Sequence, residues 1–268
     1  NELKDNLHGN VKLVFQPAEE RDGGALPMIE EGVLENPKVD AAFAAHLWGY
    51  LNEGEVHLKE GPMMASPDIF NIKVIGKGGH GAVPQESIDP IVITCQIVNS
   101  LQTIVNPLDP VVITCGRIQG GDCHNVIPNE VELEGTIRTF NEETRNWVPK
   151  VMEDLIRGIT TSQGAAYEFK YEPKYPALIN DKYMTSFAKE SLKKVVGEEN
   201  VFDLKEPNMG GEDFAYFAQK VPSAFIFVGI ANNKSEPVIH HNPYFKWDSK
   251  NVGILAQSLS QIAIDYLK

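Results

Sequence analysis

The chain has 268 residues, of which 42% are hydrophobic, and its formal net charge is −13 because 37 acidic residues oppose 24 basic ones. This is the composition of a globular protein that is long enough for two domains of ordinary size. So negative a charge argues against a nucleic-acid partner and against attraction to anionic membranes, since both need a basic face. No stretch approaches the roughly 20 consecutive apolar residues of a membrane-spanning helix, which predicts a soluble protein.

Cysteine usage and the start of the sequence give two further expectations. The three cysteines, Cys95, Cys115 and Cys123, include no C-x-x-C pair, so neither a disulfide framework nor a zinc finger is indicated, and a cytoplasmic location is expected. The sequence starts with Asn1, and "ELKDNL" is typical of the last turns of an amphipathic helix. We therefore expect that sequence is missing upstream.

The first part of the chain, to about residue 66, has the pattern of α/β structure. Apolar runs predict strands at residues 11–15, 41–46 and 54–59, and a short helix is expected at residues 24–31. Glycines and prolines separate these elements, as they do between strands and helices in general.

Residues 68–178 read as a self-contained domain of a different kind. Alternating and helical periodicities predict the order strand, helix, strand, strand, helix, strand, at residues 68–77, 90–104, 110–119, 129–140, 141–161 and 165–175. This order is typical of a ferredoxin-like βαββαβ domain.

The remainder of the chain returns to α/β patterning. A helix is expected at residues 181–196, another after Asp213, a strand at residues 223–230 and a terminal helix from Asn251. The sequence therefore predicts an α/β domain, formed by residues 1–67 and 179–268, that is interrupted by the ferredoxin-like domain of residues 68–178.

Polar side chains follow three of these apolar runs. Glu19 and Glu20 come just after the first run, His46 closes the second, and His240 and His241 stand in "IHHNPYF". Adjacent carboxylates at a strand end repel each other unless water or a cation offsets the repulsion. Carboxylates and imidazoles together are typical ligands of zinc, cobalt or manganese. Taken singly, a strand-end histidine is more often a hydrogen-bonded structural residue, and a doubled glutamate is often surface decoration.

Six motifs in order carry a resemblance that covers essentially the whole chain: "GNVKLVFQPAEE", "AAHLWG", "GGHGAVP", "NVIPNEVELEGTIRTF", "MGGEDFAYF" and "HHNPYF". Together they resemble the dinuclear-metal aminoacylase and carboxypeptidase family. Within it they are most similar to the amidohydrolase branch, which includes hippurate hydrolases and indole-acetyl-amino-acid hydrolases acting on N-acyl amino acids. The resemblance implies a zinc-exopeptidase-like catalytic domain with an inserted lid and dimerisation domain.

The resemblance also implies roles for the residues after the apolar runs. Glu20, His46 and His241 would be ligands of two divalent metal ions, zinc, manganese or cobalt. His241 is favoured over His240 because the branch places its ligand directly before the residue-Pro-aromatic turn. Glu19 would be the general base that takes a proton from water and passes it to the leaving amine, since neighbouring residues of an extended segment point in different directions.

In the inserted domain the resemblance implies a second set of residues. His80 would reach the active site of the partner subunit of a homodimer and stabilise the oxyanion. Asn125 and Arg138 fit a clamp for the free carboxylate of an N-acyl amino acid, since a guanidinium binds a carboxylate in bidentate fashion. The structural alternatives are an exposed loop histidine for His80 and an ordinary strand-edge charge for Arg138.

Glu212 and Asp213 follow two glycines and precede the expected short helix. Acidic residues at this position commonly cap the helix that follows, and this is the favoured interpretation of Asp213. Glu212 is a candidate for the wall of the substrate pocket.

The sequence departs from the branch in one respect. A His-x-Cys-Gly-His-Asp segment, whose Cys and second His are metal ligands in the branch, is absent, so an incomplete metal site is expected in this chain. The expected function is a metal-dependent amidohydrolase acting on a small N-acyl amino acid or short peptide. The alternatives are a non-catalytic dimerisation or acyl-amino-acid-binding fragment and a dipeptidase of the same family.

Overall fold

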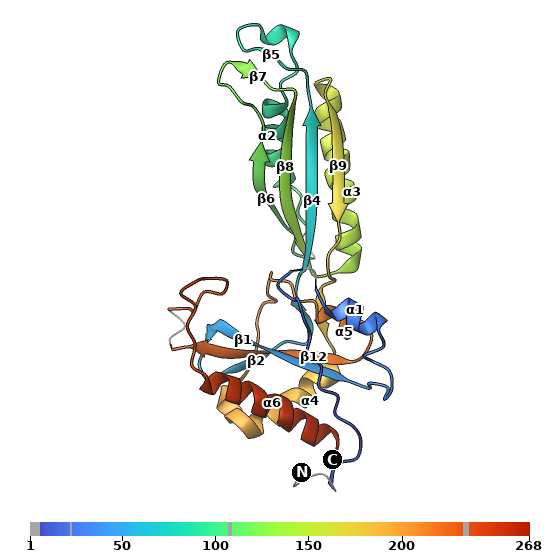
Figure 1. The fold of residues 1–268 in the computed structure, drawn as a ribbon, viewed down its shortest axis with the longest axis vertical. Helices are drawn as coiled ribbons and strands as arrows, with labels where there is room; N and C mark the ends of the chain where they lie inside the picture. The colour runs from blue at the N-terminus through green and yellow to red at the C-terminus, as the bar shows by residue number, and fades with distance from the viewer. Residues whose placement is uncertain (1–5, 22, 107–108, 233–235) are drawn as a thin grey trace. The chain divides into compact units, whose positions relative to one another are not determined.

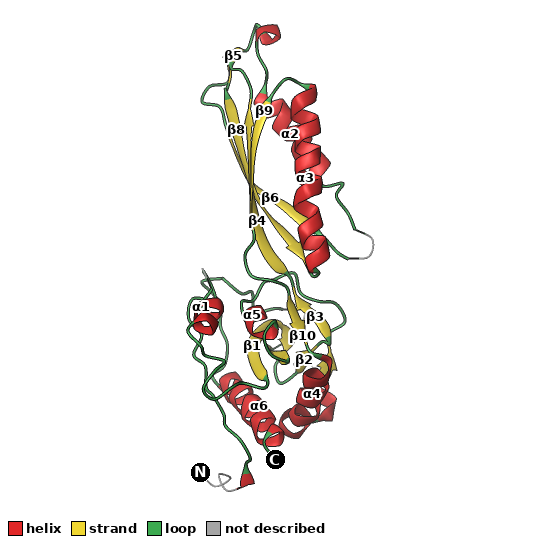
Figure 2. Ribbon diagram, turned by 90° about the vertical axis from the view of Figure 1, so that its right-hand side faces the viewer, coloured by secondary structure: helices red, strands yellow, loops and turns green. Residues whose placement is uncertain are grey.

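A computed structural model describes residues 6–21, 23–106, 109–232 and 236–268 of the chain (Figure 1). The chain divides into two compact units. Unit 1 comprises Asn1–Met64, Leu178–Asn208 and Glu212–Lys268, and unit 2 comprises Ala65–Ala177 and Met209–Gly211. Both units combine helices with strands (Figure 2), which confirms the predicted mixed α/β class.

A four-stranded sheet forms the centre of unit 1. Its strands, in spatial order, are β1 (Ala42–Asn52), β12 (Ser223–Ala231), β2 (Val56–Leu58) and β11 (Val201–Asp203). β12 pairs parallel with β1 and antiparallel with β2, and all of its residues are buried. A strand buried on both faces needs mostly apolar residues, and β12 is apolar at every position after Ser223.

Helices cover both faces of this sheet. They are α1 (Ala25–Glu30), α4 (Lys182–Val196), α5 (Ala215–Ala218) and α6 (Lys250–Tyr266). Phe225 and Phe227 of β12 pack in the cluster that includes residues of α1 and α5, whereas Ala224 and Ile226 pack in the cluster that includes residues of α4 and α6. The alternation of side chains along β12 therefore distributes them between two cores.

Unit 1 also contains a short antiparallel pair at the point where the chain leaves it and returns. β3 (Gly61–Met64) pairs with β10 (Leu178–Asn180), and Met64 lies opposite Leu178. The buried Asn180 links this pair to the main sheet, because its side-chain amide accepts from the backbone N–H of Phe225 at 2.7 Å and donates to the carbonyl of Phe225 at 3.1 Å.

Unit 2 is built on an antiparallel four-stranded sheet with two helices. The strands, in spatial order, are β6 (Val112–Gln119), β8 (Glu130–Thr139), β4 (Ser66–Ile75) and β9 (Ala166–Glu172), and the helices are α2 (Pro90–Leu101) and α3 (Glu142–Ser162). Along the chain the order is β4, α2, β6, β8, α3, β9. Two short strands, β5 (Gly79–His80) and β7 (Val126–Ile127), pair with each other near the end of β4 and the start of β8 (Figure 1).

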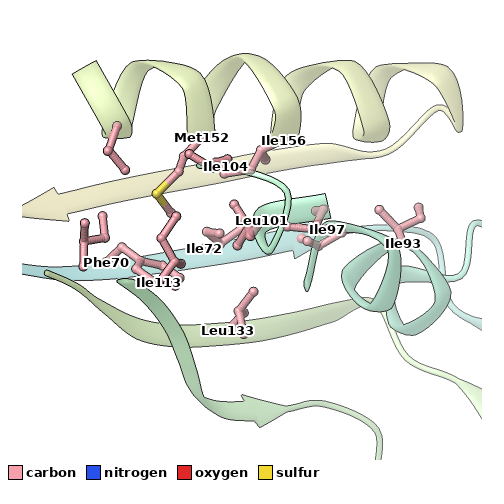
Figure 3. Close-up of a cluster of buried hydrophobic side chains, with 13 residues drawn as sticks. Phe70, Ile72, Ile93, Ile97, Leu101, Ile104, Ile113, Leu133, Met152 and Ile156 are labelled. Carbon is pink, nitrogen blue, oxygen red and sulfur yellow. The ribbon is translucent and has the colours of Figure 1, made fainter. Parts of the chain in front are cut away.

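The core of unit 2 lies between its sheet and its two helices (Figure 3). Phe70, Ile72 and Val74 alternate along β4 and are all fully buried, as expected of a strand with one covered face. Each helix begins with a side-chain cap: Asp89 accepts from two backbone N–H groups at the start of α2, and Asn141 does the same for α3.

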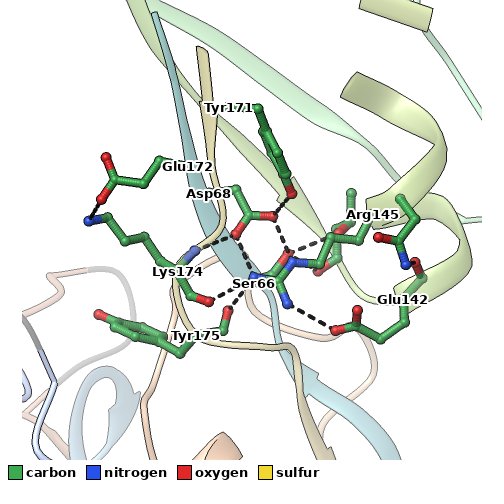
Figure 4. Close-up of polar contacts among 10 residues, drawn as sticks. Ser66, Asp68, Glu142, Arg145, Tyr171, Glu172, Lys174 and Tyr175 are labelled. Atoms are coloured by element: carbon green, nitrogen blue, oxygen red, sulfur yellow. Dashed lines mark hydrogen bonds and ion pairs between the residues drawn. The ribbon is translucent and has the colours of Figure 1, made fainter. Parts of the chain in front are cut away.

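A buried polar network stands at the end of unit 2 where the chain enters and leaves it (Figure 4). The carboxylate of Asp68 is fully buried and accepts from Nε and Nη2 of Arg145, at 2.8 and 2.7 Å. It also accepts from the hydroxyl of Tyr171 at 2.5 Å and from the backbone N–H of Lys174 at 2.9 Å. Burial lowers the pKa of Arg145, but the hydrogen bond and charge of Asp68 outweigh it and raise that pKa overall. The network satisfies two charges that would otherwise be costly to bury.

The predicted strand at residues 11–15 is wrong. The structure shows no regular secondary structure there, and no described strand pairs with the segment. Lys12 instead donates from Nζ to the carbonyls of Val33, Glu35 and Pro37, at 2.8, 2.6 and 3.0 Å. An apolar run becomes a strand only where a neighbour satisfies its backbone, and here most of the apolar side chains are exposed.

Other elements differ from the prediction at their boundaries. β1 continues to Asn52, so His46 lies within a strand and not at its end. α2 ends at Leu101 and not at residue 104, because hydrogen bonds between residues three apart, from Thr103 to Ser100 and from Ile104 to Leu101, tighten its last turn. The expected helix end at residues 2–7 falls largely on residues 1–5, outside the described residues. In the described part of the chain, no helix combines the length and hydrophobicity needed to cross a membrane.

Candidate metal centre

The two adjacent glutamates lie in a tight turn of unit 1. This acidic turn, residues 18–21 with Gly23, is closed by hydrogen bonds from the backbone N–H groups of Arg21 and Gly23 to the carbonyl of Ala18, at 3.2 and 2.9 Å. Ala18 has a φ of 57°, in the left-handed region that reverses the chain. The expected extended conformation is therefore replaced by a turn, which still gives Glu19 and Glu20 different surroundings.

Glu20 faces a histidine from the other end of the sequence. Its carboxylate lies 3.1 Å from Nε2 of His241, and both side chains are largely exposed to solvent. A carboxylate oxygen and an imidazole nitrogen this close together form half of a typical four-ligand metal site.

Glu19 has a more enclosed environment than Glu20. Burial raises the pKa of Glu19 to about 7, with further increases from the charges of Glu20 and Asp213 and a decrease from His241. A carboxyl group with a pKa near neutrality can both accept and release a proton at physiological pH.

His46 presents one ring nitrogen in the form that a metal requires. Its Nδ1 lies 2.7 Å from the carbonyl of Leu47, which can only accept, so Nδ1 carries the hydrogen in the neutral ring. Nε2 then bears the lone pair that binds a metal, an arrangement common among ligating histidines. The ring centroid of His46 lies 5.5 Å from that of His240.

The rings of His240 and His241 have different hydrogen-bonding and ion-pair partners. The backbone N–H of Gly49 donates to Nε2 of His240 at 2.8 Å, and the His240 ring stacks on Tyr50 and lies against Trp48. Burial lowers the pKa of His240, as do the charges of His46 and His241. The Nε2 lone pair of His240 is thus used inside the protein, which supports the preference for His241 as the ligand.

The structure brings two of the three predicted ligands of unit 1 into contact, and among the described residues Glu20, His46 and His241 do not form a group whose ligand atoms all lie within 4.8 Å of one another. Glu20 meets His241 directly, and His46 lies beside the ring that precedes His241 in the chain. One carboxylate and two imidazoles fit the donor preference of zinc, cobalt and manganese.

Glu212 lies next to Glu19 in an acidic cluster. Carboxylate oxygens of Glu19, Glu212 and Asp213 all lie within 4.8 Å of one another. Glu212 is 5% exposed, and its Oε1 accepts from the backbone N–H of Phe214 at 3.0 Å. Burial raises the pKa of Glu212 to about 8, with the charges of Glu19 and Asp213 adding to it and the hydrogen bond from Phe214 opposing it.

The predicted helix cap is wrong, because the side chain of Asp213 does not cap α5, the helix that follows it. The fully buried carboxylate accepts from the backbone N–H groups of Gly24 and Ala25, at 2.7 and 2.9 Å, and so caps the start of α1. It also accepts from the side-chain amide of Gln16. The sequence alone indicates no role for Gln16 beyond its position directly before Pro17 and the glutamates.

In unit 2, His80 lies on β5 with one ring nitrogen already used. The backbone N–H of Ala82 donates to Nδ1 of His80 at 3.0 Å, so Nε2 carries the hydrogen in the neutral ring and can donate outward. The neighbouring Asn125 accepts from the backbone N–H of Gly81 at 2.9 Å. His80 and Asn125 therefore belong to one group of residues around the β5 and β7 pair.

Arg138 belongs to the opposite end of unit 2. It lies opposite Pro67 near the end of β8, whereas Asn125 precedes β7 beyond the start of β8. Burial lowers the pKa of Arg138, while Tyr175 and Asp68 act to raise it. Within one copy of unit 2, Asn125 and Arg138 are therefore not brought together as a clamp.

The fold and the residues of the site together indicate a class of protein. A mixed α/β fold that gathers a carboxylate and imidazoles beside a half-buried glutamate is typical of metal-dependent hydrolases. The family model for peptidase family M20/M25/M40 matches residues 1–263, and the chain belongs to this family. The resemblance of the motifs is thereby confirmed.

Relatives in this family are named as amide-bond hydrolases. The chain is 38% identical over 272 residues to N-acetylcysteine deacetylase of Bacillus subtilis, matching 100% of this chain and 69% of the relative. It is 38% identical over 275 residues to IAA-amino acid hydrolase ILR1-like 4 of Arabidopsis thaliana, matching 99% of this chain and 62% of the relative. It is also similar, with a TM-score of 0.79 and 35% identity, to a Bacillus subtilis structure described as a dinuclear metal binding peptidase from the M20 family, covering 99% of this chain and 68% of that one.

Proposed function

We propose that this chain carries the metal-binding and proton-transfer residues of an amidohydrolase that cleaves the amide bond of N-acyl amino acids. The observation that carries the proposal is the contact between Glu20 and His241 directly beside Glu19, whose pKa lies near 7. The names of the deacetylase and hydrolase relatives support the reaction class.

Glu20, His46 and His241 would hold divalent metal, zinc, manganese or cobalt, and the similar structure is described as dinuclear. When bound, the metal would lower the pKa of a reacting water and polarise the amide carbonyl. Three protein ligands are fewer than two ions usually take, so we expect an incomplete site in this chain.

Glu19 would move the proton of the reaction. With a pKa near 7 it can take a proton from the attacking water and then pass it to the nitrogen of the leaving amine. The products are a carboxylic acid and a free amino acid.

Unit 2 would act as a ferredoxin-like lid and dimerisation domain at residues 68–178, with residues 1–67 and 179–268 forming the catalytic domain. The chain order of its strands and helices and the spatial order β6-β8-β4-β9 support this assignment. We further propose a homodimer in which His80 donates from Nε2 to the oxyanion in the partner's site, and in which Asn125 takes part in substrate binding. Arg138 would bind the substrate carboxylate, and Glu212 would line the substrate pocket.

Two alternatives have specific support. The small number of ligands favours a non-catalytic dimerisation or acyl-amino-acid-binding fragment, and the peptidase family name favours a dipeptidase. The cytoplasmic location stays a prediction.

Metal analysis and an amide-hydrolysis assay decide between these functions. This chain and an upstream-extended chain would be compared on N-acetyl amino acids, N-benzoyl amino acids and dipeptides. We expect bound metal and turnover of the N-acyl substrates by the extended chain. Absence of both metal and turnover from both chains would contradict the proposal, and turnover of dipeptides alone would make the protein a dipeptidase.

A further inference from the structure

The carboxylate of Asp213 is tied to both sides of the acidic turn. The side-chain amide of Gln16, before the turn, donates to Oδ1. The backbone N–H groups of Gly24 and Ala25, after the turn, donate to Oδ2 at 2.7 and 2.9 Å. One buried side chain thus holds together the two ends of the segment that contains both glutamates.

The glycines of "RDGG" allow this approach. A Cβ on Gly23 would lie 2.9 Å from Oδ2 of Asp213, and the φ of Gly23 is 78°, which L side chains rarely adopt. A Cβ on Gly24 would lie 2.1 Å from the carbonyl oxygen of Pro17. The turn is therefore shaped to let the carboxylate of Asp213 reach the backbone.

In the described residues, the acidic turn is also held by the bonds of Arg21 and Gly23 to the carbonyl of Ala18 and by the contact of Glu20 with His241. The side chain of Glu20 is 65% exposed and so is not held by packing. Hydrogen bonds to a buried carboxylate are stronger than those between neutral groups, and leaving buried partners unsatisfied costs more than the bond itself contributes. The three bonds to Asp213 thus tie both ends of the acidic turn to a fully buried side chain of unit 1.

We propose that Asp213 is a positioning residue that clamps the acidic turn and so sets Glu19 and Glu20 in place for their reaction. The catalytic consequence rests on the function proposed above, whereas the clamp itself does not.

The clamp can be tested in metal-free protein, without any assay of activity. Hydrogen exchange would be measured at the amides of Gly24 and Ala25, together with the rate of tryptic cleavage after the exposed Arg21. The variants are Asp213→Asn, which removes an acceptor, and Gln16→Met, which removes one donor and changes no charge. The matched control is Asp181→Asn, because Asp181 caps α4 in the same unit by accepting from Met184 N–H.

We expect Asp213→Asn to accelerate exchange at both amides and cleavage after Arg21 by about tenfold or more, and Gln16→Met to accelerate cleavage by a smaller factor. Asp181→Asn should lower thermal stability and leave both rates unchanged. If Asp213→Asn lowers thermal stability in the same way without selectively opening the turn, Asp213 is merely structural and the proposal is overturned.

The positioning role has a separate test with Co²⁺ alone as the probe. We expect Gln16→Met, which preserves every charge, to weaken Co²⁺ binding several-fold and to alter the visible absorption of the bound ion. In an active preparation it should lower kcat and leave KM nearly unchanged. An opened turn with unaltered Co²⁺ binding would overturn the positioning role. If neither this chain nor the upstream-extended chain binds Co²⁺, the proposed function fails, and exchange and proteolysis alone decide whether the clamp exists.

Discussion

Nε2 of His241 lies 3.1 Å from the carboxylate of Glu20, so residues near opposite ends of the sequence meet in unit 1. The adjacent His240 is engaged differently, because its Nε2 accepts from the backbone N–H of Gly49. The two neighbouring imidazoles therefore form a matched pair for testing which one binds metal.

Replacing each of these histidines should separate the ligand from the structural residue. We expect His241→Ala to lower zinc affinity at least tenfold, because it removes a ligand, with little change in thermal stability. His240→Ala should lower thermal stability, because its ring packs against Trp48 and Tyr50, while most of the zinc affinity remains. Equilibrium dialysis and thermal denaturation measure the two effects, and the reverse pattern would assign the ligand to His240.

Glu19→Gln should separate metal binding from proton transfer. The amide keeps the size of the side chain but cannot take up a proton near pH 7, so we expect turnover to fall by a factor of roughly 10² to 10⁴ with metal content unchanged. Metal analysis and steady-state kinetics on the same preparation check this. Normal turnover by the variant would show that the base is another group.

Glu212 should make the stability of the metal-free protein depend on pH. Its folded pKa is raised from 4.5 to about 8, so the folded state holds a proton that the unfolded state has lost between these values. The contribution of Glu212 to the free energy of unfolding is therefore present below pH 4.5 and is lost as the pH rises to 8.

Glu212→Gln should remove this part of the pH dependence, because glutamine stays neutral and still offers an acceptor to Phe214 N–H. Urea unfolding at pH 5 and pH 8 with a chelator present measures the difference. The control is Glu206→Gln, at an exposed position of the same unit. An unchanged difference in the Glu212 variant would contradict the raised pKa.

The buried pair of Asp68 and Arg145 should matter far more to stability than an exposed pair in the same unit. Asp68→Ala leaves a buried guanidinium without its partner, which typically costs about 3–5 kcal/mol of unfolding free energy. Glu134→Ala breaks the exposed pair with Arg117 and should cost less than about 1 kcal/mol. Urea unfolding monitored by circular dichroism compares them, and similar costs would refute a stabilising role for the network.

Arg138→Ala should weaken the recognition of a free carboxylate on the substrate. We expect KM for an N-acyl amino acid to rise about tenfold or more and KM for the corresponding amide to stay nearly constant. Arg117→Ala, at an exposed strand position of unit 2, is the control. An unchanged preference for the carboxylate would remove Arg138 from the substrate site.

Elements with a strong local signal were predictable from the sequence. β12 is a continuous apolar run bounded by polar residues, and α3 starts at the expected cap, Asn141. Glu20 and His241 belong to two of the six motifs that indicated the family, and the structure places these two residues in contact.

Features that depend on distant partners could not be predicted. The run at residues 11–15 has the composition of a strand, but composition does not reveal whether a neighbour is present to pair with it. The bonds of Asp213 to Gln16 and Gly24 join segments far apart in the chain, so local pattern indicated only a cap for the adjacent helix. The sequence also did not indicate that β1 continues past His46 to Asn52, because residue patterns locate the ends of strands poorly.

The pairing of Met64 with Leu178 has a consequence for how this architecture can change. The chain departs for unit 2 and comes back at two directly opposed positions of β3 and β10, as a hairpin loop does. Excision of residues 65–177 would need only a short reverse turn to reconnect the strands, without displacing either. Residues 65–177, which form all of unit 2 except Met209–Gly211, are accordingly joined to unit 1 in the way that allows an insertion to be exchanged as a cassette.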